Sequence, residues 1–289
     1  MNPAMTIVSM KKIRCWLRNF MLQRIGAYFP SLVVDRLETL WFSTKRYPVP
    51  ARESSVLALS RRRQMVVSEG QCEVYQWGKS IKKVLLVHGW NGRATQLGAI
   101  VNPLLAEGYE IIGFDAYGHG ASSGNCCTLF AYLHGIQQLV NDFGEFDTVV
   151  AHSFGGLAVA RAIQLGMISP KSVVYVAVPT SLLALFLGFS RQLNLPVQVQ
   201  NALSMKIQRR LSASVWEEIT MANMTKHVSQ PTLIFHDCQD QQLPIDVATD
   251  YIKADGRLKF CVTNGLGHNR ILRDEVVIQS IKTFITTNS

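Results

Sequence analysis

The sequence predicts an α/β fold with a mostly parallel central sheet and helices on both faces. Short apolar runs typical of buried strands alternate with longer stretches of helical periodicity over most of the chain. The composition agrees with this prediction, because 48% of the 289 residues are apolar and only 17% are charged. A chain of this length and composition can bury one full hydrophobic core.

Each expected strand is a short apolar run that ends close to a turn-forming or polar residue. We expect strands at 72–77, 83–88, 109–115, 147–152, 172–178, 231–236 and 257–263, and helices at 94–106, 128–143, 155–165, 244–254 and 271–287. Between residues 179 and 230 the alternation stops, and this insertion begins with an apolar stretch. We therefore expect residues 66–289 to form one domain with an insertion, called the cap below, at about 179–230.

The net charge of the chain is concentrated in residues 1–65, ahead of the expected sheet. This segment holds twelve Lys or Arg residues and three Asp or Glu residues, whereas the rest of the chain has no net charge. Apolar residues recur at helical spacing between basic ones, namely Ile13, Trp16, Leu17, Phe20 and Met21. A basic amphipathic helix of this kind is typical of peripheral contact with an anionic membrane.

Two interpretations of the basic segment stay open. Residues 10–42 either contact the inner face of a membrane, or the stretches 13–21 and 32–42 fold back onto the cap or the sheet edge. The segment is too often interrupted by charge to span a bilayer, and it lacks the features of a secretory signal. No nucleic-acid-reading module accompanies the charge, so we expect no nucleic-acid partner. We expect a cytoplasmic protein.

The residues 149–156, VVAHSFGG, indicate a strand, a sharp turn and a helix with Ser153 at the apex. Such a turn exposes the serine hydroxyl at the end of a sheet, with the amide of Phe154 beside it. The pattern departs from G-x-S-x-G only at Ala151, which adds one methyl group. A second turn follows the strand at 83–88, and there the amide of Trp90 is placed to be the second donor to an oxyanion.

Two later loops supply an acid and a base in a fixed order. The strand at 231–236 is followed by Asp237 and Asp240, and the last strand is followed by His268. The order serine, aspartate, histidine, each in a loop after a strand, is that of the α/β-hydrolase triad.

The chain resembles the α/β-hydrolase superfamily over roughly residues 71–289. The resemblance rests on HGW at 88–90, FDAYGHG at 114–120 with Ser122 and Gly124, HSFGG at 152–156, the stretch 236–244, and GH at 267–268. Within the superfamily it is similar to bacterial hydrolases with an HGWxGR turn and a GLGHxRIL ending. The resemblance implies that Ser153 is the nucleophile, His268 the base and Asp240 the acid, with Asp237 as the rival acid. It also implies that residues 66–289 are a catalytic domain and that the insertion at about 179–230 forms a helical cap over the nucleophile.

These residues predict a serine hydrolase that cleaves a carboxylic ester or thioester through an acyl-enzyme. The alternatives are carbon–carbon bond hydrolysis or acyl transfer on the same fold, and a non-catalytic scaffold that binds a membrane or partner through its basic N-terminus. The apolar start of the insertion favours a substrate with an apolar acyl part, bound by Leu182, Leu185 and Phe186; the alternative is that these side chains pack the cap onto the core. Arg93 and Arg270 are candidates for binding an anionic group or for bracing loops.

The remaining polar residues predict no cofactor and no metal. His88, His119 and His152 flank glycines or the serine at strand ends, where hydrogen-bonded histidines commonly support a turn. His236, Asp237 and Cys238 lie together but lack partners at the spacing of a zinc site. The six cysteines are scattered as small hydrophobic residues would be, which favours a reducing compartment.

Overall fold

The computed structural model describes residues 28–227, 229–245 and 258–288. The chain divides into two compact units, and each is described by itself. The sheet unit comprises Ser43–Ser181 and Ile219–Ser289, and the helical unit comprises the chain up to Phe42 together with Leu182–Glu218. The sequence expectations for 13–21 and for most of 244–254 lie outside the described residues.

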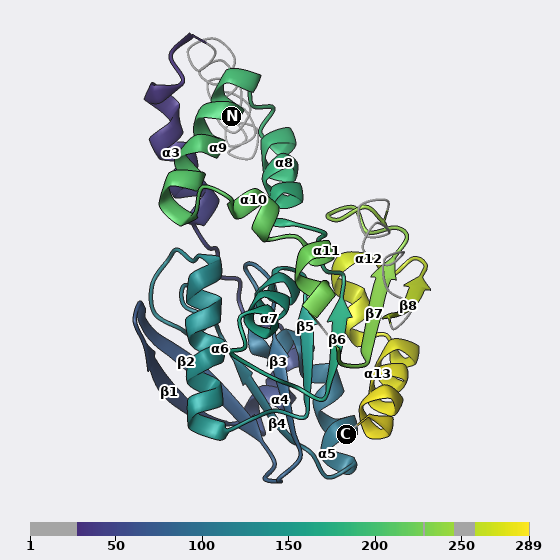
Figure 1. Cartoon of the computed structure of the whole chain (residues 1–289). Coiled ribbons are helices and arrows are strands. Elements are labelled where there is room, and N and C mark those ends of the chain that lie inside the picture. The colour runs from purple at the N-terminus through teal and green to yellow at the C-terminus, as the bar shows by residue number, and fades with distance from the viewer. Residues whose placement is uncertain (1–27, 228, 246–257, 289) are drawn as a thin grey trace, which may run out of the picture. The chain divides into compact units, whose positions relative to one another are not determined.

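The sheet unit is built on a mostly parallel sheet, which confirms the predicted fold class (Figure 1). Its order is β1-β2-β4-β3-β5-β6-β7-β8, with β1/β2 and β2/β4 antiparallel and the other neighbours parallel. The strands are β1 (Arg61–Val67), β2 (Gly70–Trp77), β3 (Lys83–Val87), β4 (Glu110–Phe114), β5 (Thr148–His152), β6 (Ser172–Val176), β7 (Thr232–Asp237) and β8 (Leu258–Thr263). Each strand expected from the sequence is present, with ends within about two residues of those expected.

Helices cover both faces of this sheet. On one face α6 (Leu129–Phe143) packs beside α7 (Phe154–Gln164), and on the other lie η2 (Ala94–Ile100), α5 (Val101–Ala106) and α13 (Glu275–Thr287). Strand side chains alternate between faces, so Val84 and Leu86 of β3 pack with Leu104 and Ile281 in one buried cluster. Shorter helices complete the unit: α4 (Ala51–Ala58), α11 (Met221–Met224), η3 (Thr225–His227), α12 (Gly267–Arg270) and η5 (Ile271–Arg273).

The helix expected at 94–106 is divided into the 3₁₀ segment η2 and the short helix α5. Pro103 explains the division. Proline has no backbone N–H, and its ring clashes with the carbonyl group four residues earlier in an α-helix. The α-helix therefore begins at Val101, which places Pro103 in its first turn.

The sheet begins earlier than the sequence boundary at residue 66. Strand β1 starts at Arg61 and pairs along its whole length with β2. Of its side chains only Met65 and Val67 are buried, while the first four residues are exposed. An edge strand with one charged, solvated half has no full alternation pattern to reveal it.

The helical unit brings the end of the N-terminal segment together with the insertion. Helix α3 (Ser31–Phe42) packs on α9 (Val197–Leu211), and α8 (Leu182–Gln192) and α10 (Val215–Glu218) complete the unit. Trp41 of α3 meets Phe186 and Phe189 of α8 edge-on, with ring centroids 5.9 and 5.3 Å apart. The rest of the insertion lies in the sheet unit, where α11 packs on α7.

The segment that follows α3 is hydrogen-bonded through Lys45 and Arg46 to the turns that come after β3 and β4. Arg46 donates hydrogen bonds to the carbonyl oxygens of Gly120, Ser122 and Gly124. The amide of Lys45 donates to the side-chain oxygen of Asn91 at 2.7 Å.

None of the helices within the described ranges is both long enough and apolar enough to cross a membrane.

Candidate active site

Ser153 occupies a strained turn between β5 and α7. Its backbone has φ 51° and ψ −127°, a conformation that non-glycine residues adopt rarely and at a cost of about 1–3 kcal/mol. The amide of Ser153 donates to the carbonyl oxygen of Val176 at 3.0 Å, which ties the turn to β6. Ala151, where the usual pattern has glycine, is fully buried in β5 without disturbing its pairing.

Two glycines allow other segments to approach this turn closely. A Cβ at Gly155 would overlap the carbonyl oxygen of His88, and a Cβ at Gly89 would lie 2.8 Å from the Cβ of Ser153. Real Cβ atoms do not come this close to backbone or Cβ atoms, so any side chain at either position would displace its neighbours. The turn after β3 is therefore held directly against the serine.

Ser153, His268 and Asp240 form a continuous hydrogen-bonded chain. The Oγ of Ser153 lies 3.0 Å from Nε2 of His268, and Nδ1 of His268 lies 2.7 Å from Oδ2 of Asp240. All three side chains are buried. Three loops at the carboxyl ends of β5, β7 and β8 thus bring together the three residues that the sequence singled out.

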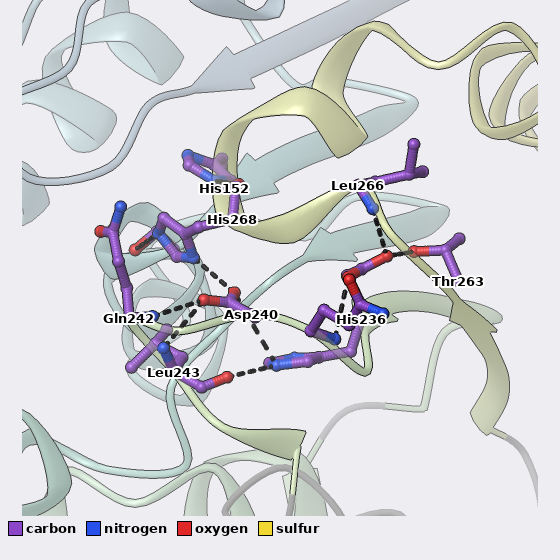
Figure 2. A network of polar contacts seen from close by, with 11 residues as sticks. His152, His236, Asp240, Gln242, Leu243, Thr263, Leu266 and His268 are labelled. Atoms are coloured by element: carbon purple, nitrogen blue, oxygen red, sulfur yellow. Dashed lines mark hydrogen bonds and ion pairs between the residues drawn. The ribbon is translucent and has the colours of Figure 1, made fainter.

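Asp240 is held by backbone amides as well as by the histidine (Figure 2). Its Oδ1 accepts hydrogen bonds from the amides of Gln242 and Leu243 at 2.8 and 2.9 Å. Burial by itself raises the pKa of Asp240, but the hydrogen bond and charge of His268 and the two amides lower it below its usual value. Asp240 is therefore a fixed anion at neutral pH.

Asp237 does not contact His268. Its Oδ2 accepts from the hydroxyl of Thr263 at 2.7 Å and the amide of Leu266 at 3.0 Å, and its Oδ1 accepts from the amide of Gln239 (Figure 2). Burial opposes ionisation, but these donors and the Gly267 amide lower the pKa of Asp237 to about 2. Asp237 thus links the loop after β7 to the loop that leads to His268.

The turn after β3 is supported by a neutral histidine. Nε2 of His88 accepts from the amide of Ala116 at 3.0 Å, so its Nδ1 carries the proton and donates to the carbonyl oxygen of Gly89 at 2.7 Å. Burial lowers the pKa of His88 to about 4. The residue after Gly89 is Trp90, whose ring meets that of Phe154 edge-on at 5.0 Å between centroids.

The amides of Trp90 and Phe154 are free to bind an anion. Within the part of the chain that the structure describes, neither amide donates to a protein acceptor. Phe154 is the first residue of α7, and the first amides of a helix point outward with the positive end of its dipole. Both candidate oxyanion donors therefore adjoin Ser153 with their hydrogen-bonding capacity unused.

The other candidate substrate-binding residues have partners of their own. The guanidinium of Arg93 is buried and donates to both carboxylate oxygens of Glu53 and to the carbonyl oxygens of Tyr47 and Pro48. Arg270 donates to the carbonyl oxygens of Gly265 and Leu266 in its own loop. These contacts correspond to the bracing role that the sequence analysis set beside anion binding.

The apolar candidates Leu182, Leu185 and Phe186 belong to α8 of the helical unit. Leu182 and Phe186 are buried, and Leu185 is partly exposed. Phe186 packs between Trp41 and Trp216 of the same unit. Its aromatic contacts are therefore internal to that unit.

No group of three or more His, Cys, Asp or Glu side chains within the described ranges could hold a metal ion.

The comparisons with known proteins agree with this architecture. Residues 84–220 match the sequence model of the alpha/beta hydrolase family. No curated protein sequence matches the chain. The match and the sheet topology together confirm the resemblance to the α/β-hydrolase superfamily, and the chain has the α/β-hydrolase fold.

Solved structures of the same fold include hydrolases of several kinds. The esterase Pf2001 of Pyrococcus furiosus is 16% identical, with a TM-score of 0.64 over 86% of this chain and 97% of its own. Est1E of Butyrivibrio proteoclasticus, solved with ferulic acid, is 18% identical, with a TM-score of 0.61 over 78% and 98%. A thioesterase domain from the curacin biosynthetic pathway is 15% identical, with a TM-score of 0.58 over 78% and 99%.

Stability is expected to fall below pH 6.5 because buried histidines stay neutral. Burial lowers the pKa of His88 to about 4 and those of His119 and His152 to about 3. Between those values and 6.5 the unfolded chain binds more protons than the folded chain, so acid favours unfolding. Each histidine costs up to about 1.4 kcal/mol per pH unit in this range.

Urea denaturation at pH 7 and pH 5 checks this expectation. The free energy of unfolding should be lower at pH 5, and in His119→Asn the difference between the two pH values should shrink. A variant that keeps the full wild-type difference would contradict the assignment of His119 as a buried neutral group.

Proposed function

We propose that the protein is a serine hydrolase that cleaves a small-molecule carboxylic ester or thioester through an acyl-enzyme. The hydrogen-bonded chain from Asp240 through His268 to Ser153 is the observation that carries this proposal. A serine hydroxyl needs a base within hydrogen-bond reach, and that base needs a partner that fixes its tautomer. The esterases and the thioesterase domain among the structures of this fold support the same reaction class.

The geometry gives each group one task. Oγ of Ser153 attacks the ester carbonyl carbon while Nε2 of His268 takes the hydroxyl proton. Asp240 holds Nδ1–H of His268 and stabilises the imidazolium that forms. The carbonyl oxygen becomes an oxyanion, which the amides of Trp90 and Phe154 bind with fixed dipoles.

The tetrahedral intermediate then collapses. The bond to the leaving alcohol or thiol breaks, and His268 returns the proton to the leaving group. Water attacks the acyl-enzyme by the same route with His268 as base, which releases the acid and restores Ser153.

Covalent labelling tests the nucleophile. A fluorophosphonate probe should add once to the wild-type protein, because an activated serine displaces its fluoride, and should not add to Ser153→Ala. Intact-mass spectrometry measures the adduct, and Ser122→Ala is the matched control that should label as wild type does. A folded wild-type protein without an adduct would favour the non-catalytic scaffold.

Replacing Asp240 should mainly lower kcat, whereas replacing Asp237 should mainly lower the unfolding temperature. In Asp240→Asn the side-chain oxygen stays on the amides of Gln242 and Leu243, so the NH₂ group faces Nδ1 of His268. That contact favours the tautomer with the proton on Nε2, which cannot accept the Ser153 proton. We expect kcat to fall about 10³- to 10⁴-fold.

Asp237→Asn is the matched comparison, because this carboxylate braces a loop without touching the imidazole. It should lower the unfolding temperature while kcat falls less than about tenfold. Steady-state kinetics on a nitrophenyl ester with thermal denaturation separates the two effects, and an equal loss of kcat in both variants would contradict the assignment of Asp240.

We also propose that the start of the described chain contacts an anionic membrane surface. Tyr28, Phe29 and Leu32 are exposed by more than half, and residues 1–27 contain five basic and no acidic residues. The opposite face of α3, with Val33, Val34 and Leu37, is buried and so is not free for lipid. Exposed apolar side chains that continue a basic segment are what an anionic lipid surface attracts.

Vesicle co-sedimentation tests this contact. The full chain should bind phosphatidylglycerol vesicles more tightly than phosphatidylcholine vesicles, and salt should weaken the binding. A variant with Tyr28, Phe29 and Leu32 all changed to Ser should lose most of it, whereas Ile81→Ser, at an even more exposed apolar site of the sheet unit, should not. Undiminished binding of the triple variant would contradict the proposal.

A further inference from the structure

His152, the last residue of β5, touches the catalytic histidine in two ways. Its Nε2 lies 3.0 Å from the carbonyl oxygen of His268, and its ring lies on the His268 ring, with centroids 4.8 Å apart and planes at 48°. The side chain is only 3% exposed. The residue directly before the candidate nucleophile therefore contacts both the backbone and the ring of the candidate base.

The partners of His152 fix its tautomer. A carbonyl oxygen only accepts, so Nε2 of His152 carries the proton and donates a hydrogen bond to the carbonyl oxygen of His268. Nδ1 is then an unprotonated nitrogen, and within the described residues it is buried without a hydrogen-bond partner.

The Nδ1 edge of His152 faces the oxyanion turn. A Cβ placed on Gly89 would lie 3.2 Å from this nitrogen. The ring is thus enclosed between Gly89 on one side and His268 on the other.

The surroundings also keep the ring uncharged. Burial is the main cause that lowers the pKa of His152 to about 3, and repulsion from a protonated His268 lowers it too, while the hydrogen bond to the His268 carbonyl oxygen and the charge of Asp240 oppose the shift. His268 becomes a cation when it takes the serine proton. A neutral ring at His152 supports His268 without repelling that charge.

We propose that His152 is a positioning residue that holds His268 in line with Ser153, through its Nε2–H bond to the His268 carbonyl oxygen and its ring contact. This inference rests on the proposed function, because it assigns His152 a role in the same reaction. His268 lies in the four-residue helix α12, which follows a loop and leads directly into η5, and among the described residues its side chain forms hydrogen bonds with Ser153 and Asp240. The bond from His152 fixes the backbone from which that side chain extends.

Two replacements separate positioning from packing. His152→Leu fills the buried space but removes the donor, so it should remain folded while kcat falls about 10- to 100-fold with KM within about threefold. His152→Gln can place its amide nitrogen near the position of Nε2 and should restore kcat to within about fivefold. His134→Gln, at an exposed histidine of α6, is the matched control and should leave kcat unchanged.

A second readout does not depend on ester turnover. The proton shared by Nδ1 of His268 and Asp240 should give a far-downfield proton NMR signal that is absent in Asp240→Asn. The signal should shift or broaden in His152→Leu and return in His152→Gln. If the wild-type protein shows the signal but cleaves no ester, the proposed function fails while the signal still decides the role of His152.

The outcomes that overturn the inference are specific. A His152→Leu protein with wild-type kcat, or with an unchanged downfield signal, would show that His268 is positioned without His152. An equal fall of kcat in the Leu and Gln variants would exclude the Nε2–H bond as the cause. A rise in KM that accounts for the whole loss would assign His152 to substrate binding instead.

Discussion

The site depends on one strained residue, Ser153, at the junction between strand β5 and helix α7. Ser153 keeps a positive φ because its neighbours leave it no alternative, with its amide bonded to β6 and the Gly89 turn pressed against its Cβ. The same junction places the first amides of α7 beside the serine. Strain of this kind persists only where the surrounding structure over-determines the backbone. The buried parallel strands β3, β5 and β6 provide that rigidity.

A second constraint is electrostatic. One ionised carboxylate, Asp240, faces the imidazole that must become positive, while the surrounding histidines His88, His119 and His152 are buried and neutral. Each of these three rings donates an N–H hydrogen bond to a backbone carbonyl oxygen. Of these four histidines, His268 is the one that changes charge in the proposed reaction. The supporting rings cost stability in acid, and this cost follows from the same burial.

The sheet and the three site residues could be predicted from the sequence for a physical reason. Strands buried on both faces must be apolar throughout, and the loops at their carboxyl ends meet at one edge, so motif order alone was enough to group Ser153 and His268 with one of two aspartates. Choosing Asp240 over Asp237 needed the family pattern, because both lie at the carboxyl end of β7. Only the three-dimensional contacts separate the one that faces His268 from the one that braces its loop.

Other features had little or no signal in the sequence. Strand β1 has a solvated basic half, so its pairing with β2 decides its conformation rather than its own pattern. The sequence left open whether 32–42 folds back onto the cap, and it could not name α9 as the partner of α3, because α9 lies far along the chain. The contact of His152 with His268 depends on how two loops approach. Arg93 kept two interpretations, anion binding and loop bracing, because its partner Glu53 lies well upstream.

The central claim is that an ester is cleaved through an acyl group carried by Ser153. Rapid-quench mass spectrometry after mixing with a nitrophenyl ester tests it directly, with peptide mapping to locate the added mass. We predict a transient acyl group on the peptide that contains Ser153 in the wild-type protein, and neither acyl group nor turnover in Ser153→Ala. Turnover that persists in Ser153→Ala, or an acyl group carried by another residue, would contradict the account.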